Sequence, residues 1–382
     1  MYVKSLKLTN FRNYRSLSLE LNATINIFVG NNAQGKTNLL ESIFLLAMGK
    51  SFRAVKEKEL ILAQQEICIV SGIIQKQATM SLQVSLSTSS QKKILVNKKE
   101  TSPSDFIGNL NVVLFTPDDL QLIKGSPSER RRFLDSEISQ VNPTYRKLYS
   151  RYQKILFQRN QALKNFNHKR KNDRDTTDLL AVWDEQLVDV GSKIILKRSE
   201  MVYKLNLLAR LIHRKITGNL EELSLVYVPF FINDFSEAQE FNKNNWNLDG
   251  VKAIFYEKLK SEREAELIRG YSLVGPQRDD LIFLINGVNA RRFGSQGQQR
   301  TAVLACRLAE LEYMKSETGS FPVVLLDDVM SELDIHRRSF LIEVLSNKFQ
   351  TVITTTDVND IDSELLRKGT LFEIEAGQVR IK

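Results

Sequence analysis

A glycine-rich loop near the start of the chain carries the clearest chemical pattern in the sequence. It matches G-x-x-x-x-G-K-[ST] at every fixed position, with the residues Gly30, Asn31, Asn32, Ala33, Gln34, Gly35, Lys36 and Thr37. The glycines let backbone N–H groups face phosphate oxygens, the lysine carries a charge for the β- and γ-phosphates, and the threonine offers a hydroxyl to Mg²⁺. A plain glycine-rich turn is the alternative. However, an apolar strand over 24–29 precedes the loop and an apolar helix follows it, so we predict a nucleotide site in which Lys36 also serves catalysis.

An acidic pair late in the chain is the natural counterpart of this loop. A β-branched apolar run over 322–326 leads into Asp327 and Asp328. We predict that Asp327 and Thr37 hold Mg²⁺, and that Asp328 is a catalytic residue that polarises an attacking water. A buried strand that ends in an acidic turn is common by itself, and only its pairing with the loop makes it specific.

A second anion-binding segment is predicted 32 residues before Asp327, in the sequence Gly294-Ser295-Gln296-Gly297-Gln298-Gln299. Ser295, Gly297 and Gln298 stand where an apolar helix begins, and helix N-termini present unpaired N–H groups to anions. Taken alone, the segment reads as a helix N-cap with a neighbouring glycine. After the acidic pair, Asp334 could likewise be an N-cap or an interface residue.

Bulk composition limits the classes of protein that remain. The chain has 382 residues, of which 42% are hydrophobic and 26% charged, as in ordinary globular proteins. No apolar run approaches the ~20 residues that a membrane helix needs, so no membrane association is expected. Two distant cysteines and three histidines predict neither a disulfide framework nor a zinc site, and a reducing cytoplasm is the expected location.

Positive charge is concentrated in one segment. Residues 124–217 contain 21 Lys or Arg and 10 Asp or Glu, an excess of 11, whereas the whole chain carries +9. Such an excess is typical of a polyanion-binding surface, although a solvated helical surface would look the same. The candidate DNA contacts, for each of which a solvated role is equally open, are Arg130, Arg131, Arg132, Lys169, Arg170 and Lys171.

Hydrophobic periodicity predicts an α/β fold with a helical arm. Residues 1–116 alternate as strands around one helix over 35–48, and two amphipathic helices over about 144–216 flank a charged tip to form an antiparallel hairpin. A third helix is expected over 246–268 and strands over 223–229, 271–274 and 280–286. The expected organisation is an ATPase lobe over 1–123, a second lobe with the arm over 124–290, and the second anion-binding segment, its helix and the rest of the ATPase over 291–382.

Several further motifs resemble those of the bacterial RecF family of ABC-type ATPases, which are related to the heads of SMC proteins. These motifs are spread over most of the chain. They are Asn10-Phe11-Arg12-Asn13-Tyr14, Gly49-Lys50-Ser51-Phe52-Arg53, Pro117-Asp118-Asp119-Leu120, Arg130-Arg131-Arg132-Phe133 and Gly275-Pro276-Gln277-Arg278-Asp279-Asp280. The resemblance implies an ABC-ATPase head, a P-loop lobe with a mixed sheet, plus a second lobe with a short antiparallel helical arm.

The resemblance also implies a function. It implies ATP and Mg²⁺ as cofactors and an ATP-dependent homodimer, in which the Ser295 segment of one copy covers the nucleotide of the other. It implies binding to junctions of single- and double-stranded DNA, weak DNA-stimulated ATP hydrolysis as a switch, and cooperation with RecO and RecR in RecA loading, repair, replication restart and the SOS response. Arg12 and Arg53 are hypothesised phosphate or cross-dimer contacts, with surface salt bridges as the alternative.

Two positions depart from the wider ABC pattern. Gln296 stands where a second glycine is usual, and the residues after the strand at 350–353 are Thr354, Thr355 and Thr356 rather than a histidine. The sensor of the γ-phosphate is therefore unassigned, and fast turnover is not expected. Competing interpretations are an ATPase of the same class that acts on something other than DNA, a transporter motor subunit, and a small-molecule kinase.

Overall fold

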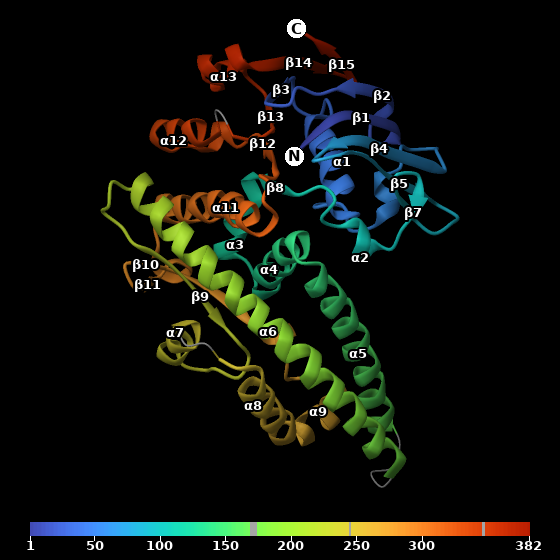
Figure 1. The fold of residues 1–382 in the computed structure, drawn as a ribbon, viewed down its shortest axis with the longest axis vertical. Helices are drawn as coiled ribbons and strands as arrows, with labels where there is room; N and C mark the ends of the chain where they lie inside the picture. Colours follow the sequence, from blue (N-terminus) through green and yellow to red (C-terminus); the bar gives the residue numbers. More distant parts are fainter. Residues whose placement is uncertain (169–173, 244–245, 346–347) are drawn as a thin grey trace. The chain divides into compact units, whose positions relative to one another are not determined.

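A computed structural model describes residues 1–168, 174–243, 246–345 and 348–382 (Figure 1). The chain forms two compact units, the first from Met1–Asp119 with Arg307–Lys382 and the second from Leu120–Cys306. The second boundary between the units therefore lies inside helix α11 (Gln296–Thr318), between Cys306 and Arg307. The sequence prediction placed this boundary before the helix, at residue 291. A continuous helix gives no compositional break that a sequence reading could detect.

The first unit is built on a six-stranded mixed sheet with the order β15-β14-β3-β13-β12-β8. All neighbouring strands are parallel except the terminal pair, and the bounds are β3 (Ile25–Val29), β8 (Val112–Phe115), β12 (Val323–Asp327), β13 (Thr351–Thr355), β14 (Gly369–Glu375) and β15 (Gln378–Ile381). The central strands β3, β12 and β13 are buried at every position, as expected for parallel strands that are covered on both faces.

A second sheet of the first unit is antiparallel and has the order β2-β1-β4-β5-β6-β7. Its strands are β1 (Tyr2–Phe11), β2 (Tyr14–Glu20), β4 (Ile67–Gln75), β5 (Thr79–Ser87), β6 (Lys93–Val96) and β7 (Lys99–Glu100). Burial alternates along β4 and β5, so only one face of this sheet joins the core.

Helix α1 (Lys36–Met48) lies between the two sheets (Figure 1). It contributes Leu39, Leu40, Ile43 and Leu46 to a core that also contains side chains from both sheets. A helix whose apolar residues are spread around most of its circumference must be buried in this way. The helix ends at Gly49, whose φ of 65° lets its N–H bond to the Leu45 carbonyl.

Shorter elements complete the first unit. They are α2 (Pro103–Phe106), α12 (Ile335–Leu345) and α13 (Ser363–Lys368), with 3₁₀ turns at Glu57–Leu60, Met330–Glu332 and Val358–Asp360 and a further one, Pro117–Leu120, at the border of the units.

The second unit is mainly helical and carries the predicted arm. Its long helices α5 (Pro143–His168) and α6 (Arg174–Ile216) run antiparallel (green in Figure 1). The other elements are α3 (Gln121–Lys124), α4 (Pro127–Val141), β9 (Leu223–Val228), α7 (Phe235–Lys243), α8 (Leu248–Ser261), α9 (Arg263–Arg269), the 3₁₀ turn Pro276–Arg278, β10 (Asp280–Ile285), β11 (Val288–Asn289), α10 (Ala290–Phe293) and the start of α11. Strands β11, β10 and β9 form a small antiparallel sheet.

Two expectations for this unit are wrong. The single helix over 246–268 is two helices that meet at Glu262, and residues 271–274 are not a strand. The segment 271–274 is instead anchored through side chains, since the Ser272 N–H donates to Asn160 and the Leu273 N–H to Glu266. These bonds replace the ladder that a strand would have needed.

Buried arginines cross-link the second unit. Arg198, 2% exposed, binds Asp135 and Asp279, each at 2.8 Å. Asp279 also accepts the Phe230 N–H at 2.9 Å and the hydroxyl of Tyr227. Burial raises the pKa of Asp279 to about 6, against the opposing effects of Arg198 and these donors. Through Asp279, the motif over 275–280 is therefore a centre of packing in this unit.

Candidate nucleotide-binding site

The phosphate loop connects the end of β3 to the start of α1, and it requires both of its glycines. A Cβ on Gly30 would lie 2.3 Å from the Ile374 carbonyl oxygen, a distance that no side chain tolerates. Gly35 has φ 116°, and a Cβ there would meet Asn13 at 2.6 Å and the Tyr14 hydroxyl at 2.9 Å. Asn13 and Tyr14 also hold the loop, donating to the carbonyls of Gln34 and Gly35, each at 2.9 Å. The sequence did not assign this supporting role to them.

Lys36 is held inside the loop. It is 7% exposed, and its Nζ donates to the carbonyl oxygens of Gly30 at 2.6 Å and Asn31 at 2.9 Å. Burial lowers the pKa of this ammonium, while the nearby carboxylates of Asp327 and Asp328 oppose the shift. The loop carbonyls thus hold the cation at the position where the motif needs a donor to phosphate oxygens.

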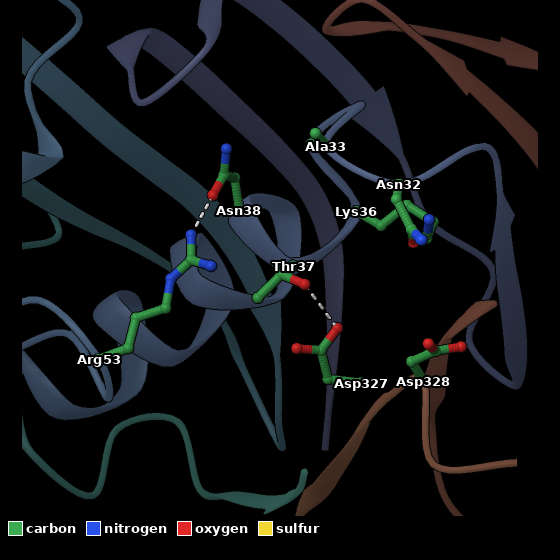
Figure 2. A pocket seen from close by; sticks show the side chains of 9 residues that line it. Asn32, Ala33, Lys36, Thr37, Asn38, Arg53, Asp327 and Asp328 are labelled. Carbon is green, nitrogen blue, oxygen red and sulfur yellow. Dashed lines mark hydrogen bonds between the residues drawn. The ribbon is translucent and has the colours of Figure 1, made fainter. Parts of the chain in front are cut away.

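Asp327, Thr37 and Thr354 form a hydrogen-bonded group at the carboxyl ends of β12 and β13. The hydroxyls of Thr37 and Thr354 both donate to Asp327 Oδ1 at 2.9 Å, and Figure 2 shows the bond from Thr37. Thr354 is fully buried and pairs with Asp327 in the register of the two parallel strands. One carboxylate and one hydroxyl are a donor set typical of Mg²⁺ sites that complete their shell with phosphate oxygens and water.

Asp328 has a strained backbone that the same threonine stabilises. Its φ is 53°, a conformation that non-glycine residues rarely adopt. Its N–H donates to the carbonyl oxygen of Thr354 at 3.2 Å and to the hydroxyl at 3.1 Å. The turn places the Asp328 carboxyl group in the lining of the phosphate pocket, where a group that polarises water is needed.

A pocket of about 200 Å³ brings these groups together (Figure 2). Its lining is mostly polar and consists of Asn32, Ala33, Gly35, Lys36, Thr37, Asn38, Arg53, Asp327 and Asp328. The size and the donors suit a phosphate group with a divalent cation. None of the lining residues in the described part of the chain is aromatic, so this pocket provides no surface on which a base could stack.

Arg12 and Arg53 share a buried carboxylate rather than standing free. Glu41 of α1 is fully buried and accepts two bonds of 2.8 Å from Arg12 and one of 3.2 Å from Arg53. Burial would raise the pKa of Glu41, but hydrogen bonds from Arg12 and Ser51 and the charges of both arginines outweigh it and lower the pKa. Arg53 also lines the phosphate pocket and donates to Asn38, whereas Arg12 donates to the Glu59 carbonyl.

The Ser295 segment, in the second unit, begins α11 as a reciprocal cap. The Gln298 N–H donates to the Ser295 hydroxyl at 3.2 Å, and the Ser295 N–H donates to the Gln298 side chain at 2.9 Å. Gln298 also donates to Glu221 at 2.8 Å, and the Ser295 side chain is exposed. In the first unit, Asp334 accepts the Arg337 N–H at 3.0 Å and so caps α12. These are the capping arrangements that the sequence left open.

The predicted DNA contacts divide into three groups. Arg130 is 3% exposed and binds Asp280 through two bonds of 2.6 and 3.0 Å, so its assignment as a surface contact is wrong. Arg131 donates to the Asp279 carbonyl at 2.8 Å and is half-buried, while Arg132 is exposed. The remaining candidates, Lys169, Arg170 and Lys171, lie outside the described residues.

The mixed sheet, the phosphate loop at the end of β3 and the acidic pair at the end of β12 define a P-loop ATPase of the ABC-head class. A family model described as the RecF/RecN/SMC N terminal domain matches residues 2–367. Proteins of Bacillus thuringiensis (strain Al Hakam) and Bacillus cereus (strain B4264), both called DNA replication and repair protein RecF, are each 42% identical over 99% of this chain and 98% of their own length. This chain belongs to the RecF family.

Solved structures agree with this assignment. Two structures of the recombination mediator protein RecF in the RecFOR pathway, described as RecF-ATP and RecF-ATPrS, are 34% identical to this chain. Their TM-scores are 0.90 and 0.89, over 100% of this chain and 97% and 98% of theirs. The Smc head domain from Pyrococcus furiosus, 13% identical with a TM-score of 0.54, shares the fold. Among the described helices, none is both long and apolar enough to cross a membrane.

Proposed function

We propose that the chain is an ATP-dependent DNA-binding protein of recombinational repair and replication restart. The observation that carries this proposal is the joint placement of Lys36, Thr37, Asp327 and Asp328 around one polar pocket. The Bacillus relatives are DNA replication and repair proteins. The solved relatives are recombination mediators whose structures are described as RecF-ATP and RecF-ATPrS. Their near-complete coverage of this chain supports a shared role.

Each residue of the pocket has a distinct task in this proposal. The N–H groups of residues 30–37 and the ammonium of Lys36 bind the triphosphate, and Thr37 and Asp327 bind Mg²⁺. Mg²⁺ neutralises charge on the phosphate oxygens when it is bound. Asp328, positioned by Thr354, orients a water for attack on the γ-phosphate. Because aspartate reaches less far than glutamate, we expect slow hydrolysis that acts as a switch.

A second copy of the chain completes the site. Ser295, Gly297 and Gln298 lie at the N-terminal end of a 23-residue helix, where N–H groups favour a phosphate. The exposed Ser295 side chain is accessible to another molecule. We propose that ATP joins two copies into a dimer on gapped DNA, that hydrolysis releases them, and that RecO and RecR cooperate with this dimer in RecA loading and the SOS response.

Gel filtration with a short duplex, in the presence and absence of ATP, tests this function. The wild type should form a dimer on DNA with ATP, and Lys36→Arg should remain monomeric because the larger guanidinium does not fit between the loop carbonyls and phosphate. Lys76→Arg is the matched control. Lys76 is also a lysine whose pKa is lowered by burial and whose Nζ donates to a backbone carbonyl, that of Gly108. A wild type that stays monomeric with ATP and DNA would refute the proposal.

A further inference from the structure

Helix α5 has an unusual distribution of charge. Its 26 residues include Arg146, Lys147, Arg151, Lys154, Arg159 and Lys164 and no aspartate or glutamate. Arg159 is fully buried and binds Asp184 and Glu266, and Arg146 donates to the Ser139 carbonyl. These two arginines serve packing, so they are not available to a ligand.

The other four cations of α5 point to solvent. Lys147, Arg151, Lys154 and Lys164 are exposed, and they make no side-chain hydrogen bond or ion pair with any described residue outside 166–179. No carboxylate of a neighbouring element neutralises them within that part of the chain. Four exposed positive charges without a neighbouring carboxylate favour the binding of an anion from another molecule.

Helix α6 of the same arm shows the opposite arrangement. Its cations are paired within the chain, and the pairs are Lys193–Asp189, Lys197–Glu200, Lys204–Glu200, Arg210–Glu222, Arg214–Glu222 and the buried Arg198–Asp135. Of the lysines and arginines on α6 over residues 180–216, Lys215 alone has no such pair. The two helices therefore have similar basic content but differ in how much of it remains available.

The exposed residues of α5 form one continuous side of the helix. Lys147, Arg151, Lys154, Gln158 and Gln161 follow at intervals of three or four residues, which places them in one row. Lys164 flanks the far end of this row. From Lys147 to Lys164 the row is about 26 Å long at ~1.5 Å per residue, which is most of one turn of B-DNA.

We infer that this side of α5, defined by Lys147, Arg151, Lys154 and Lys164, binds the phosphate backbone of double-stranded DNA. The inference rests on the proposed DNA-dependent function and assigns a surface to it. Straight rows of cations and amides suit a regular array of phosphates, and displacement of condensed counterions favours such binding. Over residues 143–165 of α5, whose burial is described, Phe157 is the one exposed large hydrophobic residue, so this part of the helix has no series of rings for stacking single-stranded bases.

A four-site variant tests the assignment. In the α5 variant, Lys147, Arg151, Lys154 and Lys164 are each changed to Gln. In the matched control, the four paired lysines Lys193, Lys197, Lys204 and Lys252 are changed to Gln, which removes the same charge. Fluorescence anisotropy with a 5′-labelled duplex and ATP, from low to moderate KCl, gives the slope of log K against log salt. Each lost phosphate contact reduces the slope by ~0.9, so the α5 variant should lose about 3 to 4 units and the control less than one.

Each outcome bears on a separate claim. An α5 variant with the wild-type slope overturns the inference, as does an equal loss in both variants, which would report total charge rather than a surface. A wild type without salt-dependent duplex binding refutes the DNA-binding function itself. ATP-induced dimerisation and circular dichroism of both variants should match the wild type, because α5 and α6 keep their buried contacts. A larger loss of affinity for a single strand than for the duplex would overturn the choice of duplex DNA.

Discussion

Thr354→Val should separate the positioning of the metal site from the stability of the sheet. The substitution keeps the shape of a fully buried side chain but removes the hydroxyl that donates to Asp327 at 2.9 Å and accepts the Asp328 N–H at 3.1 Å. Thr355→Val is a close control. Thr355 is 1% exposed on the same strand, but its hydroxyl donates to the Asp357 carbonyl and makes no bond to the acidic pair.

The magnitudes follow from the partners of the two hydroxyls. Thr354 loses a hydrogen bond to a carboxylate, which is worth about 1.5–3 kcal/mol, whereas Thr355 loses a neutral bond worth about 0.5–1.5 kcal/mol. Groups that orient a metal-binding carboxylate typically change metal affinity by ~10–100-fold when they are removed. We therefore expect Thr354→Val to raise the Mg²⁺ concentration needed for half-maximal ATP binding by at least tenfold, and Thr355→Val to leave it unchanged.

Titration of a fluorescent ATP analogue at a series of Mg²⁺ concentrations measures this effect. Urea unfolding of both variants gives the loss of stability independently. If Thr354→Val and Thr355→Val share the same Mg²⁺ midpoint, then the Thr354 hydroxyl does not position Asp327 for the metal. In that case the bond between them stabilises the sheet alone.

Two further substitutions test contacts that support the phosphate loop, namely the buried ion pairs of Glu41 and the close approach of Gly30 to Ile374. Because the folded pKa of Glu41 lies below its unfolded value of ~4.3, its ionisation stabilises the fold above that pH, and this stability is lost as the pH falls through the folded pKa. Glu41→Gln should therefore destabilise the chain at pH 7 by about 3–5 kcal/mol, and the difference from wild type in urea unfolding should shrink below pH ~4.3. A pH-independent difference would contradict this. Gly30→Ala should abolish ATP binding in a filter assay because its Cβ meets the Ile374 carbonyl, whereas the strained but open Gly319→Ala should cost about 1 kcal/mol and leave ATP affinity intact. Normal ATP binding by Gly30→Ala would refute the steric reasoning.

Local patterns predicted the elements that carry the chemistry. The loop at Gly30–Thr37 and the strand before Asp327 are fixed by residue types at short spacing, and both stand where the sequence placed them. The fold class, an ABC-ATPase head with a helical arm, was implied by the motifs that resemble the RecF family, and it is confirmed. The role of Thr354 was not predicted, because it depends on the register between β12 and β13, which pairs Asp327 with Thr354. Glu41 was missed for a similar reason, since Arg12 reaches it across 29 residues of chain.

The burial of Arg130 could have been predicted from helical periodicity, but the count of charges in the segment gave no indication of it. Phe133, Leu134 and Ile138 follow it by three, four and eight residues, so helical periodicity places Arg130 on the buried side of α4. Arg132 falls on the opposite side and is exposed. A run of three arginines thus contains one structural ion pair, one residue bound to a backbone carbonyl and one exposed side chain.

The same distinction changes the meaning of the basic middle segment. A net charge counts Arg130, Arg159 and Arg198 equally with exposed lysines, although each of these three is buried against carboxylates. Burying an unpaired arginine is prohibitive, so such pairs belong to the folding of the second unit and contribute little to an external field. Within residues 124–217, four of the exposed cations that have no partner among the described side chains lie on α5, a helix without acidic residues, and the others are Lys124, Arg132 and Lys215. The excess of positive charge therefore predicts a polyanion surface for α5 and internal cross-links for much of the rest.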